Sequence, residues 1–214
     1  MKKHRGVFVS GIGTEVGKTV VSALLVRALQ ADYWKPVQSG DLDHTDTMKV
    51  QKWAGEQAGQ FHPERHRLTL PMSPHASAEA DGLHLQLSDF RLPATDNFLV
   101  TEGAGGLHVP LNHRDLVIDL IGQLQLPVVL VSRHYLGSIN HTLLSVEALR
   151  SRGISIAALI FNGEEHPTTE SVIEEMTGIK ALYRVGELPD FSEGAFAKAA
   201  AALRERWEGA ALPA

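Results

Sequence analysis

The chain has 214 residues, 43% of them hydrophobic and 21% charged, with a formal net charge of −5. These values are typical of one globular domain with a full apolar core, and they argue against a general nucleic-acid binder, which normally carries a basic face. Since there is no cysteine, no apolar run of ~20 residues and no leader-like start, we exclude disulfides, thiolate chemistry and a membrane span, and expect a cytoplasmic protein.

The first predicted elements are a β-strand over Gly6–Ser10 and an amphipathic helix over Thr19–Gln30, joined by the loop GIGTEVGKT. A glycine-rich loop between a strand and a helix is the arrangement of a phosphate-binding loop, because its backbone N–H groups and the helix N-terminus face an anion together. In such a loop Lys18 reaches the β- and γ-phosphates of a nucleotide, and the Thr19 hydroxyl ligates Mg²⁺.

The loop departs by one residue from the usual spacing of this motif, G-x-x-x-x-G-K-[ST]. Ile12 stands where the first glycine belongs, and Gly11 precedes it. The alternative interpretation is a glycine-rich turn with an exposed lysine, which the flanking strand and helix disfavour. At the crest of the loop, Thr14 and Glu15 either face a substrate or are plain turn residues, and Val16 is expected to pack.

The second predicted strand, Tyr33–Val37, places Lys35 near its end. The following Pro36 favours extended backbone at Lys35, so the ammonium group can point toward the phosphate edge of the sheet; the alternative is a lysine that reaches water. A polar helix is predicted over Asp46–Ala58. Asp46 is a candidate metal ligand by its position alone, and a polar helix start explains it equally well.

The third predicted strand, Asn97–Thr101, is followed at once by Glu102 and the glycine-rich segment Gly103–Gly106. A carboxylate in this position suits Mg²⁺ that is bound to ATP, and glycines let the backbone approach phosphate closely. The alternative is a solvated carboxylate in a turn. Before this strand, the irregular segment Gly59–Asp81 is expected to be a loop excursion beside the site.

Strand and helix continue to alternate along the rest of the chain. Strands are predicted at Val128–Ser132 and Ile154–Phe161, and helices at Leu116–Gln125, Ile139–Arg150, Thr168–Thr177 and Phe196–Trp207. This pattern predicts an α/β fold of the P-loop NTPase type, a doubly wound, mostly parallel sheet with helices on both faces. Ligands of such sheets lie at the carboxyl ends of the strands. We expect a single domain over residues 1–208 and a frayed tail over residues 209–214.

Sequence blocks along nearly the whole chain resemble those of the dethiobiotin synthetases. The loop GIGTEVGKT, with its longer glycine spacing, is similar to the GTxTxVGKT signature of that family. Further blocks follow in the family's order, namely YWKPVQSG (33–40), MSPHASA (72–78), TEGAGGLHVPL (101–111), LPVVLVSRHYLGSINHTLLS (126–145) and GELP (186–189). The loop and EGAGG blocks also suit related P-loop amidoligases, whereas KPVxSG, SPHxSA and LGxINH together are more specific.

The resemblance implies an ATP-dependent ligase that forms C–N bonds in biotin biosynthesis, in which 7,8-diaminononanoate, CO₂ and ATP give dethiobiotin, ADP and phosphate. One amine takes up CO₂ as a carbamate, ATP phosphorylates the carbamate to a mixed anhydride, and the second amine attacks the anhydride and closes the cyclic urea. No protein nucleophile is needed, which agrees with the absence of cysteine. The implied cofactors are ATP and Mg²⁺, and the implied partners are small molecules rather than nucleic acid or membrane.

The resemblance also implies roles for individual residues. Lys18 and Lys35 are the implied catalytic residues, with Lys18 on the phosphate and Lys35 on the carbamate and the transferring phosphoryl group. The implied metal ligands are Thr19, Asp46 and Glu102. The other implied nucleotide-binding residues are Thr14, Glu15, Val16, Gly17, Val20, Gly103, Ala104, Gly105, Asn162, Gly163, Pro189, Asp190 and Phe191. Among these, the amide of Asn162 would read the adenine.

The implied substrate contacts come from two places in the chain. Ser39 contacts the substrate, and the turn formed by Gly137, Ser138 and Asn140 opens a helix whose N–H groups bind the substrate carboxylate. In the family this turn comes from the neighbouring subunit, which implies a homodimer. The segment Glu164–Met176 lacks the aromatic residue that family members often carry near the substrate tail.

Three other functions compete with this interpretation. A regulatory or partitioning ATPase of the deviant P-loop type usually carries an extra lysine where this chain has Gly13. An amidoligase for a large corrinoid carboxylate normally needs a glutamine-hydrolysing partner domain with a cysteine nucleophile. A non-catalytic nucleotide-binding module is disfavoured by the joint presence of Lys35, Asp46 and Glu102.

Overall fold

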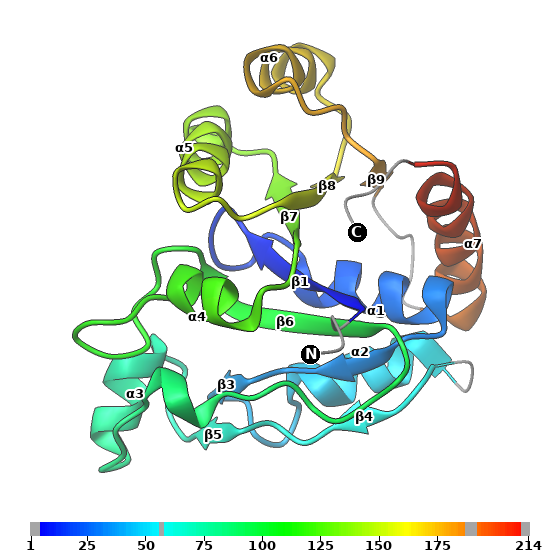
Figure 1. Cartoon of the computed structure of the whole chain (residues 1–214). Coiled ribbons are helices and arrows are strands. Elements are labelled where there is room, and N and C mark those ends of the chain that lie inside the picture. The colour runs from blue at the N-terminus through cyan, green and yellow to red at the C-terminus, as the bar shows by residue number, and fades with distance from the viewer. Residues whose placement is uncertain (1–4, 56–57, 187–191, 211–214) are drawn as a thin grey trace.

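A parallel sheet forms the centre of the molecule, and the computed structural model describes residues 5–55, 58–186 and 192–210 (Figure 1). Within these residues the sheet has seven strands in the order β4-β2-β6-β1-β7-β8-β9. Their bounds are β1 (Gly6–Gly11), β2 (Asp32–Trp34), β4 (Phe61–His62), β6 (Leu99–Gly106), β7 (Val128–Arg133), β8 (Ile156–Asn162) and β9 (Tyr183–Val185). All of the strand pairs are parallel, so the carboxyl ends of the strands share one edge.

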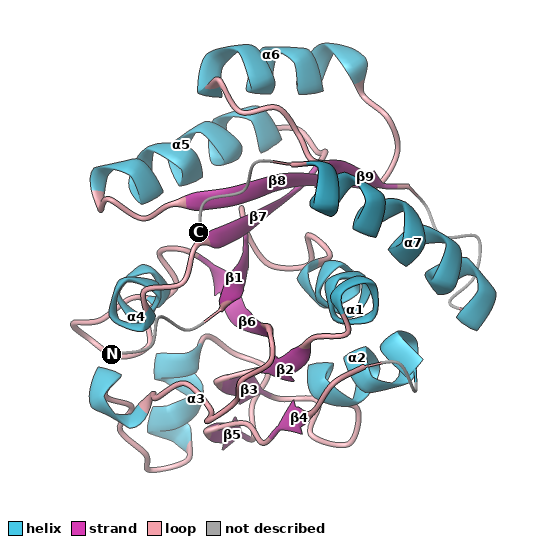
Figure 2. Ribbon diagram, turned by 45° about the vertical axis from the view of Figure 1, so that its right-hand side comes forward, coloured by secondary structure: helices cyan, strands magenta, loops and turns pink. Residues whose placement is uncertain are grey.

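Helices cover both faces of the sheet (Figure 2). They are α1 (Lys18–Leu29), α2 (Asp46–Ala54), α3 (Pro74–Ala80), α4 (Val117–Leu124), α5 (Ser138–Ser151), α6 (Pro167–Thr177), α7 (Glu193–Gly209) and the short 3-10 helix η2 (Leu87–Asp89). Side chains alternate along β1, so that Val7 and Val9 enter a core with α1, α2 and α7. Phe8 enters a second core with α3, α4, α5 and α6. The predicted doubly wound fold with helices on both faces is confirmed.

Two predicted strands differ from the structure by more than one or two residues at an end. The strand expected over Tyr33–Val37 is divided into β2 and β3 (Val37–Ser39), and β3 pairs with β5 (His66–Leu68) in a separate sheet. Pro36 lies at the break, because proline has no N–H to donate to a ladder. The third strand does not end at Thr101 but continues to the end of β6, so Glu102 lies inside a strand.

The segment Gly59–Asp81 is more regular than a loop excursion, because it contains β4, β5 and α3. Its strands are too short to leave a periodic pattern in the sequence. The helix expected over Asp46–Ala58 ends earlier, at the end of α2. At the other end of the chain, α7 reaches Gly209, one residue into the predicted tail, and residues 211–214 lie outside the described residues. None of the described helices is both long enough and apolar enough to cross a lipid bilayer.

Candidate active site

The loop between β1 and α1 is held in place from β7 and β8. Gly17 stands just before α1 with φ 95°, and a Cβ atom there would lie 2.1 Å from Nδ2 of Asn162, so only glycine fits. Asn162 Nδ2 donates a hydrogen bond to the Val16 carbonyl at 3.0 Å. On the other side, Arg133 Nη1 donates to the carbonyl of Glu15 at 3.3 Å. The crest of the loop is therefore tied to two neighbouring strand ends.

Lys18 opens α1 and folds back over this loop. Its side chain is buried, and Nζ donates to the carbonyl of Gly13 at 2.9 Å. Burial lowers the pKa of Lys18 from 10.5 to about 8, because the charged form loses its hydration; the nearby charge of Lys35 lowers it further and that of Glu102 works against the shift. An anion in the loop would therefore meet an ammonium group whose present partner is a neutral carbonyl.

Glu102 accepts hydrogen bonds from three side chains of the site. Although its residue is only 1% exposed, both carboxylate oxygens have partners. Oε1 accepts hydrogen bonds from Thr19 Oγ1 at 2.9 Å and from Lys35 Nζ at 3.2 Å. Oε2 accepts a hydrogen bond from the Tyr33 hydroxyl at 2.9 Å. Burial, with the charge of Glu102 beside it, raises the pKa of Tyr33 well above its ordinary value, so this hydroxyl stays a donor.

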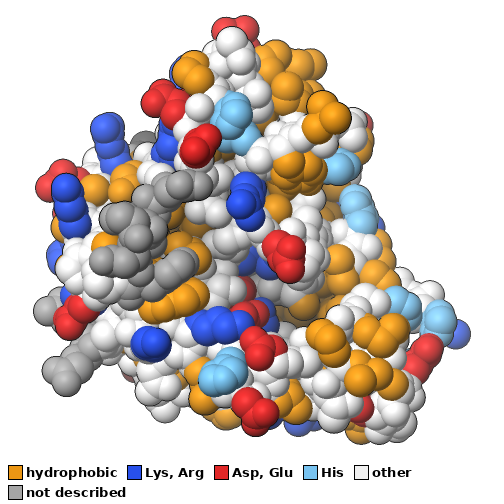
Figure 3. Space-filling model, turned by 180° about the vertical axis from the view of Figure 1, so that it is seen from behind, with side chains coloured by type: hydrophobic (Ala, Val, Ile, Leu, Met, Phe, Trp, Pro, Cys, Tyr) orange, Lys and Arg blue, Asp and Glu red, His pale blue; other side chains and the backbone are white. Residues whose placement is uncertain are grey.

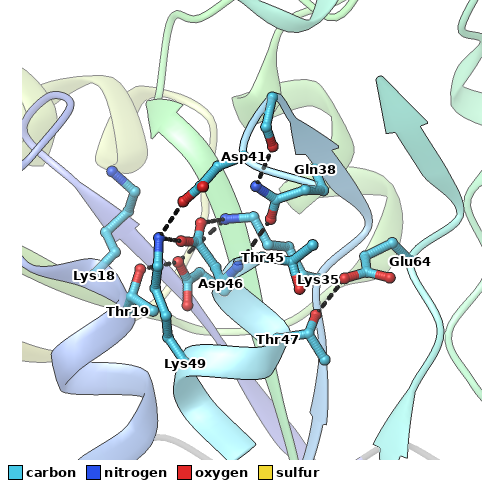
Figure 4. A network of polar contacts seen from close by, with 12 residues as sticks. Lys18, Thr19, Lys35, Gln38, Asp41, Thr45, Asp46, Thr47, Lys49 and Glu64 are labelled. Carbon is cyan, nitrogen blue, oxygen red and sulfur yellow. Dashed lines mark hydrogen bonds and ion pairs between the residues drawn. The ribbon is translucent and has the colours of Figure 1, made fainter. Parts of the chain in front are cut away.

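Lys35 joins Glu102 to Asp46, and Figure 4 shows Lys35 beside Asp46. Its Nζ lies 2.5 Å from Asp46 Oδ2. Burial acts to lower the pKa of Lys35, but the charges of Glu102 and Asp46 outweigh it and the pKa is raised. Burial likewise acts to raise the pKa of Asp46, and Lys35 outweighs it, so that pKa is lowered. Both groups are charged at neutral pH, and the ammonium group is shared by two carboxylates.

The start of α2 fixes Asp46 within this network. Thr45 is the N-cap, because its Oγ1 accepts a hydrogen bond from Met48 N at 3.2 Å. The backbone N–H of Asp46 donates to Gln38 Oε1 at 3.1 Å. One turn further along, Lys49 Nζ lies 3.6 Å from Asp46 Oδ1 and 2.7 Å from Asp41 Oδ2.

These groups surround a cavity of about 730 Å³. Of the residues predicted from the sequence, the lining includes Thr14, Glu15, Gly17, Lys18, Thr19, Val20, Lys35, Ser39, Asp46, Glu102, Ala104 and Gly105. The hydroxyl of Ser39 is buried and has no hydrogen-bond partner among the described residues, so its hydrogen-bonding capacity is unused there. On the face that Figure 3 shows, basic and acidic side chains lie side by side around a recess.

Other predicted residues lie away from the lining of this cavity. Gly103 packs against Phe8 on the far side of β6, where an added Cβ would lie 2.7 Å from Phe8 Cε1. Val16 belongs to the loop and is buried in the core, and Asn162 and Gly163 lie at the end of β8. The turn with Gly137, Ser138 and Asn140 lies at the start of α5. The predicted nucleotide contacts at Pro189, Asp190 and Phe191 lie outside the described residues.

Sequence reasoning missed three residues that contact Glu102 or Asp46, namely Tyr33, Gln38 and Lys49. Two of them follow a local periodicity that could have found them. Tyr33 precedes Lys35 by two residues, which places both side chains on the same side of extended backbone. Lys49 follows Asp46 by three residues, which places both on one face of a helix.

The donor set fits Mg²⁺ that is held together with phosphate. Mg²⁺ commonly takes one or two carboxylates, with its other ligands from phosphates and water. Glu102 and Asp46 supply the carboxylates, and the Thr19 hydroxyl lies beside Glu102. Among the described residues no group of three or more histidine, cysteine or acidic side chains could hold a metal ion by itself. The site therefore suits a metal that arrives with a polyphosphate.

Comparison with known proteins adds to this geometry. A family model described as an AAA domain matches residues 5–194. The ATP-dependent dethiobiotin synthetase BioD of Christiangramia forsetii is 52% identical over 202 residues, which cover 94% of this chain and 97% of that protein. The enzyme of the same name from Cytophaga hutchinsonii is 43% identical over 208 residues, covering 97% of this chain and 99% of that protein.

Solved structures support the fold. The cell division ATPase MinD of Pyrococcus furiosus superposes with a TM-score of 0.59 at 16% identity, covering 95% of this chain and 98% of the other. At this identity the likeness concerns the fold alone, and it agrees with the predicted P-loop NTPase type. The identities to the two enzymes, over nearly the whole of each chain, establish the family relationship. The chain belongs to the family of ATP-dependent dethiobiotin synthetases.

Proposed function

We propose that this chain is an ATP-dependent dethiobiotin synthetase of biotin biosynthesis, and that its cavity is where 7,8-diaminononanoate, CO₂ and ATP are converted to dethiobiotin, ADP and phosphate. The observation that carries this proposal is the network of Thr19, Lys35, Asp46 and Glu102 beside the phosphate-binding loop. It combines the oxygens that a metal–nucleotide complex needs with an ammonium group for the reacting atoms.

The chemistry asks the protein for positioning and charge rather than for a nucleophile. A carbamate formed from one substrate amine and CO₂ is a poor acylating agent until one of its oxygens is phosphorylated. The second amine then attacks the carbamate carbon, the C–O bond to phosphate breaks, and phosphate leaves as the cyclic urea closes. Negative charge on the transferring phosphoryl group is stabilised best by fixed cations in a site with little water.

Lys35 and Lys18 are the proposed cations that stabilise the negative charge of the phosphoryl group. Lys35 is buried and fixed by two carboxylates, so its Nζ has one defined place near the carbamate and the transferring group. Lys18 can leave the carbonyl of Gly13 for the phosphates. The proposed Mg²⁺ ligands are Thr19, Asp46 and Glu102, and the metal would supply Lewis-acid stabilisation of the phosphate oxygens.

The substrate is proposed to lie against Ser39, because its hydroxyl has no hydrogen-bond partner among the described residues and could bond an amine. We propose that its carboxylate binds the N–H groups at the Gly137–Asn140 turn of a second subunit, so that the enzyme is a homodimer. Exposed apolar side chains beside this turn support such an interface, because Leu136 is fully exposed and Leu144 is 52% exposed.

Recognition of the adenine is proposed for Asn162 at the end of β8. One amide hydrogen of Asn162 is donated to the Val16 carbonyl. Among the described residues, the side-chain carbonyl and the second amide hydrogen have no hydrogen-bond partner, and together they match the donor and acceptor pair of an adenine edge. The base would then lie next to the loop that holds the phosphates.

The test is ADP release by the full chain in the presence of bicarbonate and Mg²⁺, with and without 7,8-diaminononanoate. The proposal expects ADP formation that depends on the diamine, and a product that contains the cyclic urea by mass spectrometry. ADP appearing at the same rate without the diamine would instead support an ATPase whose product is a conformational switch.

A further inference from the structure

Helix α2 brings a third ammonium group to the phosphate cavity, in addition to Lys18 and Lys35. Lys49 lies one turn after Asp46, and both side chains line the cavity. Figure 4 shows Lys49 beside Asp46, with contacts to Asp46 and to Asp41. Lys49 lies outside the sequence blocks that resemble the family, between residues 33–40 and 72–78.

The three ammonium groups differ in how firmly they are held. Lys35 is buried between two carboxylates. Among the described residues, Lys18 bonds only the neutral carbonyl of Gly13. Lys49 pairs at 2.7 Å with Asp41, whose side chain is 51% exposed, and its own side chain is 35% exposed. Exposed ion pairs contribute little to stability because water and salt screen them, so Lys49 can exchange this partner at small cost.

The backbone around Asp41, by contrast, is held by hydrogen bonds that do not involve Lys49. It has φ 53° and follows Gly40, and its carbonyl accepts a hydrogen bond from His44 N at 3.0 Å. The next carbonyl, that of Leu42, accepts from Arg67 Nη2 at 3.2 Å. The backbone of the turn at Asp41 is therefore held in place, while Lys49 has a long flexible side chain that lines the cavity.

An anion that enters the cavity changes the balance around Lys49. A phosphoryl group beside Lys18 and Lys35 adds charge in a partly enclosed space, where Coulomb interactions are stronger than at the exposed rim. We propose that Lys49 is an additional phosphate-binding residue, which leaves Asp41 for the terminal phosphoryl group when ATP binds. The inference rests on the proposed function, because it takes the cavity to be the triphosphate site.

The test compares two nucleotides that differ in the terminal phosphoryl group. Binding of ADP and of the non-hydrolysable analogue AMP-PNP, each with Mg²⁺, is measured by calorimetry for the wild-type chain and for Lys49→Met. We expect the variant to lose about tenfold in affinity for AMP-PNP, the size of one charge-assisted hydrogen bond, while its affinity for ADP stays within about twofold. Lys49→Arg should keep most of the AMP-PNP affinity.

Asp41→Asn separates this model from a merely structural ion pair. If the Lys49 ammonium group leaves Asp41 to bind the phosphoryl group, removing the Asp41 charge leaves the affinity for AMP-PNP unchanged or higher. Lys49→Met, by contrast, lowers this affinity. If the pair only braces α2, the two variants weaken binding together. Lys52→Met, on the exposed side of α2, is the matched control for loss of one positive charge.

The outcomes distinguish the inference from the proposed function. Two results would overturn the role of Lys49 and leave the proposed function intact. One is a folded Lys49→Met variant that keeps the wild-type ratio of AMP-PNP affinity to ADP affinity. The other is an Asp41→Asn variant that loses affinity for AMP-PNP as Lys49→Met does. Failure of the wild-type chain to bind either nucleotide removes the triphosphate site, and the role of Lys49 with it. Thermal unfolding followed by circular dichroism identifies any variant that does not fold, and Lys49→Arg then tests the same prediction.

Discussion

At the scale of single residues, the site is a set of charges that satisfy one another. Glu102 accepts hydrogen bonds from Thr19, Lys35 and Tyr33, and Lys35 also contacts Asp46. A buried carboxylate without partners would be costly, whereas this one is held in a single orientation by three donors. The oxygens proposed to hold a metal are therefore oriented before any ligand arrives.

Replacing Lys35 by methionine should abolish most of the turnover while the fold is kept. The change removes the ammonium group proposed to stabilise the transferring phosphoryl group, a loss of ~3–4 kcal/mol in transition-state stabilisation. We expect kcat for diamine-dependent ADP release to fall by about two to three orders of magnitude. The control is Lys198→Met on the exposed side of α7, which should retain wild-type activity. Turnover near the wild-type rate in Lys35→Met would contradict the assigned role.

The affinity for nucleotide should depend on pH through Lys18. Its pKa in the free protein is lowered by burial to about 8, and a bound polyphosphate favours the charged form and raises that pKa. Affinity for ADP should therefore be flat below about pH 8 and fall by up to about tenfold per pH unit above it, where binding must take up a proton.

Calorimetry from about pH 7.5 to about pH 9.5 in the absence of Mg²⁺ measures this dependence on Lys18 without involving the metal ligands. Lys18→Arg is the control, because a guanidinium group stays charged throughout and should flatten the profile. If wild-type affinity does not fall in the alkaline range, the lowered pKa of Lys18 does not govern nucleotide binding.

At the scale of elements, long periodic segments could be predicted from the sequence and short ones could not. Hydrophobic periodicity in the local sequence predicted the longer elements. These are the helices α1, α4, α5, α6 and α7 and the strands β1, β7 and β8. The strands β4, β5 and β9 have two or three residues each. Strands this short are fixed by their neighbours in the sheet rather than by their own residues.

Asp32 fixes the opposite edge of the sheet from the site. Its Oδ1 accepts hydrogen bonds from Gln60 N at 2.8 Å and Asn97 Nδ2 at 3.0 Å, and its Oδ2 from Thr95 Oγ1 at 2.7 Å and His62 Nε2 at 3.2 Å. Burial acts to raise the pKa of Asp32, but these hydrogen bonds outweigh it and the pKa is lowered. One carboxylate therefore connects the starts of β2, β4 and β6.

Asp32→Asn should destabilise the protein by about 1–3 kcal/mol at pH 7, as expected when a buried charged acceptor is lost. Because the folded pKa lies below the unfolded value, the contribution of Asp32 is present above ~3.9 and is lost as the pH falls through the folded pKa. Urea unfolding measures the free energy of unfolding of wild type and variant at pH 7 and in this acid range. The difference between the two proteins should shrink as the pH falls. Glu205→Gln on α7 is an exposed control, and a difference that stays constant with pH would contradict the assignment.

At the scale of the whole molecule, the sheet brings together residues far apart in the chain. The parallel strands β1, β2 and β6 bring three residues to one cavity: Thr19 in the helix after β1, Lys35 just after β2, and Glu102 within β6. The rule for open α/β sheets predicts this edge of the sheet from sequence order alone. The rule gives the edge of the sheet but not side-chain contacts. The hydrogen bond from Tyr33 to Glu102 and the contact from Lys49 to Asp46 depend on packing between elements, so sequence reasoning did not find them.

The proposed dimer should depend on the exposed apolar side chains at the start of α5. Leu136 is fully exposed beside the Gly137 turn, and Leu136→Glu would place a charge in the interface. Analytical ultracentrifugation should give the wild type a mass of twice the 23.3 kDa of one chain. The mass of the variant should be closer to that of one chain. Diamine-dependent activity should fall with it, while ADP binding persists. The control is Leu83→Glu, a substitution at another exposed leucine. A wild-type protein that sediments as a single chain at working concentrations would contradict the dimer.

The position of Lys35 between Asp46 and Glu102 has a consequence for the order in which ligands enter. A divalent ion without a nucleotide would compete with the ammonium group of Lys35 for both carboxylates. The ammonium group would then lose these partners and gain no new ones. An ion already chelated by a nucleotide brings new oxygen partners for that ammonium group. Joint entry is therefore favoured over entry of the bare ion, and the empty enzyme should bind free Mg²⁺ poorly.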